Sequence, residues 1–452
     1  MKQASFFESD MPKHTDIVSG RGHSNGSMNK LSREDRAFHD WYRFVLSFPA
    51  HLVTEYIQRF RLNPGNRVLD PFCGTGTTLV EAKKQGIPSV GIEANPMAHF
   101  ASSVKLDWNI DPAAMADHAE RVVAAVAEEL KSLGIYDEPL LWVLNSDEVP
   151  LRTLGSEQEK LLLKNSISPL PLHKALVLLD HLNLKSSGEN PFHRHEKLAF
   201  AKTVLYSASN LRFGPEVGVG TIRRDAPVLK SWLDEVKAMA ADIGTVASSG
   251  DVPAEVFHAD ARSVTHLLAP DSVDAVITSP PYPNEKDYTR TTRLESVLLG
   301  FIMTREDLRA LKQNLVRSNT RSVYKKDDDD LWVADHKEIQ AIAEKIESRR
   351  IELGKTSGFE RLYARVTKLY FGGMARHLAD MRLVLRPGAH LAYVVGDQAS
   401  YLRIMIRTGE ILADIAKSLG YELVGIDLFR TRLSTATREQ LREEVVVLRW
   451  PE

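Results

Sequence analysis

The chain has 452 residues, with 58 Lys and Arg against 60 Asp and Glu, a formal net charge of −2 and one cysteine, Cys73. This length exceeds one ordinary hydrophobic core, so we expect one large elaborated domain or two domains. The near-neutral charge excludes a globally basic nucleic-acid binder, and the single thiol excludes an intramolecular disulfide framework and a cysteine-rich zinc site.

The N-terminus lacks the apolar core of a signal peptide, and no apolar run approaches the roughly 18 residues that span a bilayer. Together with the single thiol, these features predict a soluble cytoplasmic protein without a membrane partner. Residues 1–35 are polar and contain two glycine-rich stretches, so we expect a mobile N-terminal arm. From Phe38 to Phe60 the periodicity is helical, with an interruption at Ser47-Phe48-Pro49, where Pro49 suits the first position of a helix.

A strand, a glycine turn and a helix follow. Arg67–Asp70 is the strand, Gly74 and Gly76 let the backbone approach a ligand closely, and Thr77 or Thr78 can cap a helix over Leu79–Lys84. The loop has neither the Gly-Lys-Ser/Thr of a phosphate loop nor the third glycine of the dinucleotide fingerprint. A second strand, Ser89–Glu93, ends in a carboxylate roughly 20 residues past the glycines, where a ribose diol can be read. The alternative for Glu93 is an exposed strand-end residue.

Residues 110–251 form a mostly helical insert. We treat the glycine-rich stretch Asn210–Gly220 within it as a substrate-side loop or a plain connection between helices. His193 and His195 lack further spaced ligands, so we predict no metal site. The expected helices of the insert are Ala113–Leu133, Glu157–Leu163, His173–Leu182, Glu196–Leu211 and Val228–Ile243.

The sheet pattern resumes at Glu255–Arg262, where Asp260 lies just beyond a short strand and suits the cap of a following helix. Asp274–Ile277 then reads as a buried parallel strand and leads into Thr278-Ser279-Pro280-Pro281-Tyr282. The prolines fix the backbone and remove two N–H donors, leaving carbonyls and the Ser279 hydroxyl as acceptors beside the Tyr282 ring. Because ligands bind beyond the carboxyl ends of such strands, this cluster suits a planar group that carries an amine.

Between Lys286 and Lys326 there are ten Lys and Arg against four Asp and Glu, just before the acidic run Asp327–Asp330. These cations either neutralise phosphates or form a solvated face that the acidic run balances. The remaining expected elements are a long helix over Phe359–Leu385, a strand over Ala389–Asp397, a helix over Gly409–Leu419, and strands over Tyr421–Phe429 and Glu444–Trp450 joined by a charged loop.

Thr278–Tyr282 resembles the catalytic motif of S-adenosylmethionine-dependent amino-methyltransferases that act on DNA bases. Asp70–Thr77 resembles their first motif, Asp-Pro-Phe-x-Gly-x-Gly-Thr, at every fixed position. The resemblance implies an α/β fold with a Rossmann-like class I methyltransferase sheet. Its catalytic domain would span 36–109 and 252–452, with a large helical insert, 110–251. This insert and the basic segment 286–370 are both candidates for reading DNA.

The resemblance also implies roles for individual residues. Phe48 would contribute to the pocket for the methionine end of S-adenosyl-L-methionine, and Asp260 would accept a hydrogen bond from the adenine amine. Ser279 Oγ and the Pro280 carbonyl would hold the target amine while Tyr282 stacks on an extruded base. The catalytic residues are thus Ser279, Pro280, Pro281 and Tyr282, and the cofactor-binding residues are Phe48, Asp70, Pro71, Phe72, Gly74, Gly76, Thr77, Glu93 and Asp260.

The Ser-Pro-Pro-Tyr form resembles the cytosine-N4 branch, whereas Asp or Asn in place of Ser279 is more usual in the adenine-N6 branch. We therefore expect methylation of cytosine N4 in double-stranded DNA, with a cognate restriction endonuclease as a partner. Many cytosine-N4 enzymes carry the two motifs in the reverse order, so adenine N6 stays open, as do an RNA or protein-glutamine methyltransferase and a non-catalytic nucleic-acid-binding module. Carbon-5 methylation is excluded, because it needs a thiolate and Cys73 lies in the cofactor loop.

Overall fold

The computed structural model describes residues 35–43, 48–138, 150–184, 190–214, 216–246, 251–284, 286–433 and 439–452. Nearly all of the expected N-terminal arm, residues 1–34, lies outside the described residues, as does Ser47. None of the helices in the described part of the chain is long and apolar enough to cross a membrane.

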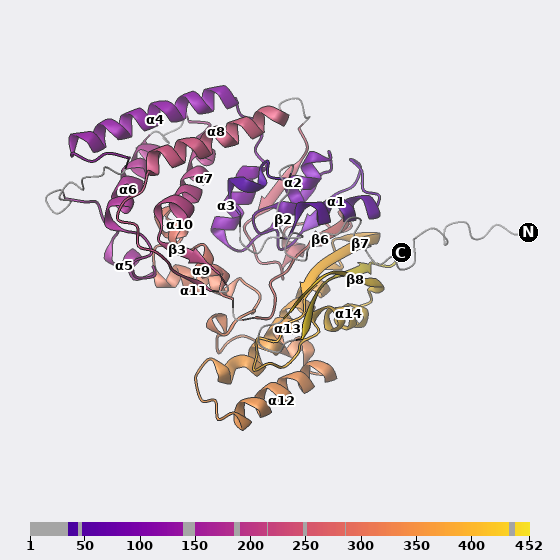
Figure 1. Cartoon of the computed structure of the whole chain (residues 1–452). Coiled ribbons are helices and arrows are strands. Elements are labelled where there is room, and N and C mark those ends of the chain that lie inside the picture. Colours follow the sequence, from indigo (N-terminus) through magenta and orange to yellow (C-terminus); the bar gives the residue numbers. More distant parts are fainter. Residues whose placement is uncertain are drawn as a thin grey trace, which may run out of the picture.

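A seven-stranded sheet forms the centre of the molecule (Figure 1). In spatial order, the first five strands are mutually parallel, and the sixth runs antiparallel to its neighbours on both sides. A parallel sheet closed by an antiparallel hairpin is the class I methyltransferase sheet that the sequence predicted. In spatial order the strands are β5 (Ala254–Phe257), β2 (Ser89–Ile92), β1 (Val68–Asp70), β6 (Val273–Thr278), β7 (Leu385–Gly396), β9 (Gln440–Arg449) and β8 (Glu422–Leu433).

Side chains alternate between the two faces of the sheet, as the period of two in a strand requires. On β7, Leu391 and Tyr393 pack into one apolar cluster, whereas Ala392 and Val394 pack into another on the opposite face. Both faces are buried because helices cover each of them. On one face lie α1 (Ala50–Arg59), α2 (Thr77–Lys84) and α3 (Pro96–Lys105), and on the other lie α12 (Lys337–Glu352), α13 (Tyr363–Met381) and α14 (Thr408–Ser418).

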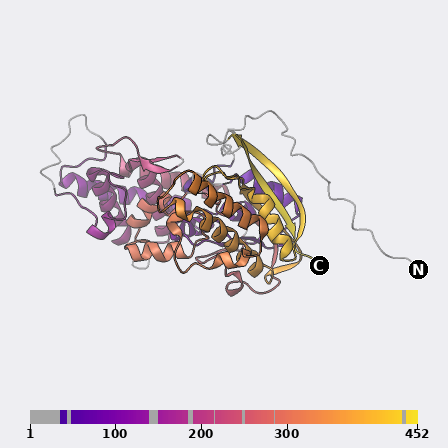
Figure 2. The same ribbon diagram turned by 90° about the horizontal axis from the view of Figure 1, so that it is seen from below.

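The insert packs beside this sandwich (Figures 1 and 2). Its long helices share an apolar cluster with Leu79 of α2 and Met97 of α3, so the insert is continuous with the core of the catalytic domain. The insert comprises α4 (Pro112–Ser132), α5 (Ser156–Glu159), α6 (Pro169–Leu184), α7 (His193–Thr203), a π-helical turn (Val204–Ala208), β3 (Leu211–Phe213), β4 (Val217–Val219) and α8 (Val228–Val246).

Three expectations about local structure were wrong. Asn210–Gly220 contains an antiparallel hairpin of β3 and β4, not a loop between helices. The charged loop expected between the last two strands is largely paired, with Arg430 opposite Glu443. Pro387 and Gly388 lie inside β7 instead of ending a helix.

After β6 the chain forms three short helices, α9 (Tyr288–Thr291), α10 (Arg293–Leu298) and α11 (Arg305–Gln313), before α12. Several of the cations counted in this segment form internal ion pairs. Lys312 pairs with the buried Asp287, and Arg317 pairs with Asp327 of the acidic run. Asp329 of the acidic run is 4% exposed and pairs with Arg262, which lies outside this segment.

Candidate active site

A cavity of about 830 Å³ lies at the carboxyl ends of the parallel strands. Its wall includes residues that directly follow β1, β2, β5, β6 and β7. The strand order reverses between β1 and β6, and the crevice at such a reversal is where open α/β sheets bind ligands. The volume falls within the roughly 300–1,000 Å³ of small-molecule and cofactor sites.

The glycine loop after β1 forms one wall. Pro71, Phe72, Gly74 and Thr77 line the cavity, and Gly74 has a left-handed backbone with φ +51°. Gly76, outside the lining, has φ +86° and ends the loop directly before α2; a Cβ there would lie 3.0 Å from the Ser102 Cβ.

The expected threonine cap of α2 was wrong. The helix begins at Thr77, Gly76 occupies the capping position, and no side chain caps the helix. The Thr78 hydroxyl instead donates a hydrogen bond to the Ile277 carbonyl, 3.0 Å away, and ties α2 to the strand that leads into the catalytic motif.

Asp70 lies beneath the cavity and is fully buried. Its Oδ1 accepts hydrogen bonds from the Phe72 N–H at 3.1 Å and from the Thr278 hydroxyl at 2.6 Å. The carboxylate therefore joins the glycine loop to the Ser279 motif. Burial raises the pKa of Asp70 to about 6, partly opposed by these hydrogen bonds.

Glu93 is held by backbone N–H groups at the end of β2 and is not the exposed strand-end residue of the alternative interpretation. Its Oε2 accepts from Gly74 N at 2.8 Å, and its Oε1 accepts from Asn95 N at 2.7 Å. Burial raises the pKa of Glu93 to about 7. The side chain lines the cavity, so a carboxylate with spare lone pairs is present where a diol can be bound.

Asp260 lies across the cavity from the glycine loop, after β5. Its carboxylate accepts from the Arg262 backbone N–H at 2.9 Å and from Arg262 Nη2 at 2.6 Å. Arg262 also pairs with the buried Asp329. Asp260 caps no helix, because the next helical turn starts after Ser263 without a side-chain cap. The ion pair instead fixes the carboxylate at the cavity wall.

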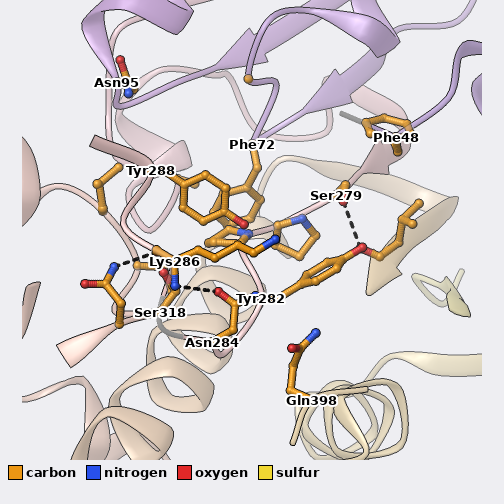
Figure 3. Close-up of a pocket in the computed structure, with 18 of the residues that line it drawn as sticks. Phe48, Phe72, Asn95, Ser279, Tyr282, Asn284, Lys286, Tyr288, Ser318 and Gln398 are labelled. Atoms are coloured by element: carbon orange, nitrogen blue, oxygen red, sulfur yellow. Dashed lines mark hydrogen bonds between the residues drawn. The ribbon is translucent and has the colours of Figure 1, made fainter. Parts of the chain in front are cut away.

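Phe48 and Pro49 also line the cavity. Helix α1 begins at Ala50, so Pro49 is the residue that precedes the helix and not its first residue. The aromatic side chain of Phe48 thus lies near the catalytic motif, on the same side as Ser279 (Figure 3).

The catalytic motif leaves β6 and forms the wall opposite Asp260. Ser279 Oγ donates a hydrogen bond to the Val394 carbonyl at 3.2 Å (Figure 3). It is also hydrogen-bonded to the Tyr282 phenol, which leaves one lone pair of the Ser279 oxygen for a ligand. Tyr282 is half-buried in the cavity wall beside Gly396, where an added Cβ would lie 3.2 Å from the ring. Thus Ser279, Pro280, Pro281 and Tyr282 share one cavity with Gly74 and Glu93.

Sequence reasoning missed several cavity residues. Tyr288 and Lys286 follow the motif closely, and Figure 3 shows both beside Tyr282. Their nearness in sequence was the one available signal. Gly214 and Glu216 were not singled out, but they lie in Asn210–Gly220, for which a substrate-side loop was one of the two interpretations, and both line the cavity.

Cys73 and His195 are both buried. Burial raises the pKa of the Cys73 thiol far above its usual value, so it is no thiolate nucleophile. His195 is buried and bonds the Asp107 carbonyl through Nε2. Within the described ranges, no group of three or more His, Cys, Asp or Glu is arranged to hold a metal ion.

The sequence is similar to known DNA methylases. The family model described as a DNA methylase of the N6/N4 type matches residues 18–102. The type II methyltransferase M.AvaI of Nostoc sp. is 25% identical over 440 residues, which cover 91% of this chain and 86% of that enzyme. The type II methyltransferase M.BsoBI of Geobacillus stearothermophilus is 27% identical over 303 residues, which cover 62% of this chain but little more than half, 56%, of that enzyme.

Comparisons with solved structures are weaker. TrmN from Thermus thermophilus is 12% identical with a TM-score of 0.28, covering 92% of this chain and 52% of that one. The rRNA methyltransferase AviRa from Streptomyces viridochromogenes is 11% identical with a TM-score of 0.32, covering 92% and 94%. Scores of this size do not establish a common fold, so the fold assignment rests on the strand order above.

The donor set of the cavity fits S-adenosylmethionine, the methyl donor of this family. Carboxylates of Glu93 and Asp260 follow neighbouring strands, and Gly74 of the glycine loop lines the same cavity. With these residues sharing one cavity with a Ser-Pro-Pro-Tyr motif, and with the sequence matches to DNA methylases, the chain is similar in sequence and in site to the S-adenosylmethionine-dependent DNA amino-methyltransferases.

Proposed function

We propose that the protein methylates the exocyclic N4 amine of cytosine in double-stranded DNA. The observation that carries this proposal is the Ser279 hydroxyl, which lies in the cavity wall with its proton donated to the Val394 carbonyl. A hydroxyl held in this way can accept a hydrogen bond from an amine. Adenine N6 is the second candidate, because the matched family covers both amines.

The chemistry needs acceptors because the amine of a nucleobase is a poor nucleophile, with its lone pair delocalised into the ring. Acceptors aimed at its N–H bonds favour the pyramidal form and interact more strongly as positive charge develops on the nitrogen. We assign Ser279 Oγ and the Pro280 carbonyl to this task. Neither Pro280 nor Pro281 has an N–H group that would compete for the same position.

S-adenosylmethionine, when bound, supplies an electrophilic methyl group. In our proposal Glu93 binds the ribose diol, Asp260 accepts from the adenine amine, and Phe48 and Phe72 surround the remainder. Asp70 is outside the cavity lining and acts as a positioning residue, since its carboxylate links the loop at Phe72 to Thr278. A fixed spacing between the two walls is what in-line methyl transfer demands.

The target base must leave the duplex to enter such a cavity, at a cost of a few kcal/mol. Stacking on an aromatic ring contributes about 1–3 kcal/mol per base, which offsets a comparable amount. We assign this stacking to Tyr282. No strong base is needed in the site, because the nitrogen becomes acidic once it is methylated.

We further propose that the insert and the basic segment 286–370 contact DNA around the base. The hairpin of β3 and β4 supports a role for the insert, because it contributes Gly214 and Glu216 to the cavity wall. We also propose a cognate restriction endonuclease as a partner, since the relatives M.BsoBI and M.AvaI are type II methyltransferases.

The test is to methylate DNA of known sequence with labelled S-adenosylmethionine, digest it to nucleosides and identify the labelled one. We expect N4-methyldeoxycytidine. Recovery of N6-methyldeoxyadenosine would support the second candidate, methylation of adenine N6. Methyl transfer to tRNA but not to DNA would refute both candidate functions. Mapping the modified positions in the same reaction gives the recognition sequence.

A further inference from the structure

Lys286 extends into the cavity and has no carboxylate partner within the described residues. It lines the cavity wall, and Figure 3 shows its side chain running between Tyr288 and Tyr282. Three nearby cations differ in this respect, since Arg290, Lys312 and Arg317 each pair with a carboxylate.

The backbone at Lys286 is fixed on both sides. Its N–H donates to Asn284 Oδ1 at 3.0 Å, and its carbonyl accepts from Asn319 Nδ2 at 3.1 Å. The next residue, Asp287, caps α9 and pairs with Lys312 Nζ at 2.7 Å in a buried site. A buried ion pair and two amide hydrogen bonds therefore hold the segment from which the lysine projects.

The ammonium group is poorly compensated in its surroundings. Burial and the nearby Arg432 lower the pKa of Lys286, while Glu216 and Glu443 act in the opposite direction without forming an ion pair with it. Taking a cation out of water is costly unless an acceptor replaces the lost solvent. A ligand that brings a carbonyl oxygen to this ammonium would supply that acceptor.

We propose that Lys286 is a specificity-determining residue that donates a hydrogen bond to the ring carbonyl O2 of the extruded cytosine. This inference rests on the proposed cytosine-N4 function. Cytosine carries its amine, a ring nitrogen and the carbonyl along one edge, and flipped bases are read at that edge. Adenine has a C–H group where cytosine has the carbonyl, so a donor placed beyond Ser279 and Pro280 accepts cytosine and rejects adenine.

The test is a double-mutant cycle between the protein and the base. Two duplexes carry the mapped site with either cytosine or a 2-aminopyridin-5-yl C-nucleoside at the target position. The analogue keeps the amine and ring nitrogen but has C–H in place of the carbonyl. On cytosine we expect Lys286→Met to lower kcat/KM by about 10- to 100-fold, the range for a hydrogen bond to a charged group. On the analogue the two proteins should differ little, and the cycle cancels the analogue's altered reactivity.

Lys417→Met is the control, because Lys417 is an exposed lysine of α14 that lies outside the cavity wall and outside both segments proposed to contact DNA. It should behave as the unaltered protein on both duplexes. Thermal unfolding and S-adenosylmethionine affinity check that Lys286→Met is folded. If Lys286→Met does not fold, Lys286→Gln, which keeps an N–H donor, is measured in its place. Lys286→Gln should retain part of the discrimination between the duplexes.

The possible failures are distinguishable. If the unaltered protein methylates adenine or no DNA, the proposed function itself is wrong. If it methylates cytosine N4 but Lys286→Met lowers kcat/KM by the same factor on both duplexes, only the assignment of Lys286 is overturned. A log–log salt slope that falls by about 0.9 on both duplexes in Lys286→Met would identify a phosphate contact and also overturn it.

Discussion

Ser279 differs from a simple strand-end serine because its hydroxyl proton already takes part in a hydrogen bond within the protein. The hydroxyl donates to the Val394 carbonyl and is also hydrogen-bonded to the Tyr282 phenol, so an amine that enters the cavity meets the remaining lone pair of the Ser279 oxygen. The sequence alone predicted an acceptor at this position from the two following prolines. It did not predict the partner, since Val394 lies 115 positions further along the chain.

We expect Ser279→Ala to lower kcat by about 100-fold, comparable to removal of one preorganised hydrogen-bond partner in other active sites. S-adenosylmethionine affinity should stay unchanged, because Ser279 belongs to the wall assigned to the base. Single-turnover kinetics and equilibrium cofactor binding measure the two quantities. Ser400→Ala is the control, as this exposed serine lines the same cavity. Equal loss of turnover and cofactor binding would show that Ser279 is structural.

Glu93 predicts a pH dependence of cofactor binding. Burial raises its pKa to about 7, so the free protein loses the ionised acceptor as the pH falls through 7. Diol hydrogens favour the ionised carboxylate, and affinity for S-adenosylmethionine should therefore rise from pH 6 to pH 8. Glu93→Gln should bind more weakly and with little pH dependence. Isothermal titration across this range is the measurement, with the exposed Glu255→Gln as control. The same profile in both variants would contradict the assignment.

At the scale of elements, the parallel strands were predictable and the hairpins were not. Val68–Asp70 and Val273–Thr278 belong to strands that are buried on both faces of the sheet. Such strands are rich in consecutive apolar residues, which made them recognisable in the sequence. The hairpin of β3 and β4 has neither an apolar run nor clean alternation, and glycine residues led to its interpretation as a loop. Its first strand is anchored by contacts distant in sequence, such as the Asn210 N–H to Ser166 carbonyl bond at 2.7 Å.

The end of β7 sets the position of the Tyr282 ring. A Cβ at Gly396 would approach the ring within 3.2 Å, and a displaced ring would stack poorly on a base. We expect Gly396→Ala to raise KM for DNA several-fold while cofactor affinity is retained. Gly425→Ala on β8, the edge strand of the same sheet, is a matched control, because a Cβ there meets no atom within 4 Å. Steady-state kinetics on both variants provide the measurement, and indistinguishable DNA KM values would exclude this role for Gly396.

At the scale of the whole molecule, buried polar contacts join segments that are far apart in the sequence. Tyr42 donates to Glu295 of α10, and Glu295 is fully buried with a pKa raised to about 7 by burial. Such links were invisible in the sequence, because a single Tyr or Glu carries no periodic signal. They also make the stability of the fold depend on pH.

A carboxyl group whose pKa is raised on folding stabilises the native state when protonated. The contribution of Glu295 is therefore complete below about pH 4.5 and is lost as the pH rises through 7. Relative to Glu295→Gln, which keeps a partner for Tyr42, the unaltered protein should lose up to about 3 kcal/mol of unfolding free energy between pH 5 and pH 8. Urea unfolding of both proteins across this range tests the sign, and a constant difference would contradict the pKa shift.

The insert meets the catalytic domain at Glu216, whose Oε2 lies 3.3 Å from Arg290 Nη1 and 3.7 Å from Arg321 Nη1. This single carboxylate, half-exposed at the cavity, neutralises two arginines of the segment proposed to contact DNA. Phosphates that bind these arginines must compete with it. Removing the carboxylate should therefore strengthen DNA binding at low salt and make it more dependent on salt.

For Glu216→Gln we expect the slope of log affinity against log salt concentration to steepen by about 0.9 for each arginine that gains a phosphate. The unaltered protein should already lose DNA affinity with salt, since the segment also has exposed cations such as Lys325 and Lys326. Fluorescence anisotropy with a labelled duplex at several salt concentrations gives both slopes. Glu157→Gln is the control, because Glu157 pairs only with Lys160 on an exposed turn of the insert. If Glu216→Gln binds DNA with an unchanged slope, Arg290 and Arg321 do not contact phosphates, and the insert hairpin serves only to close the cavity wall.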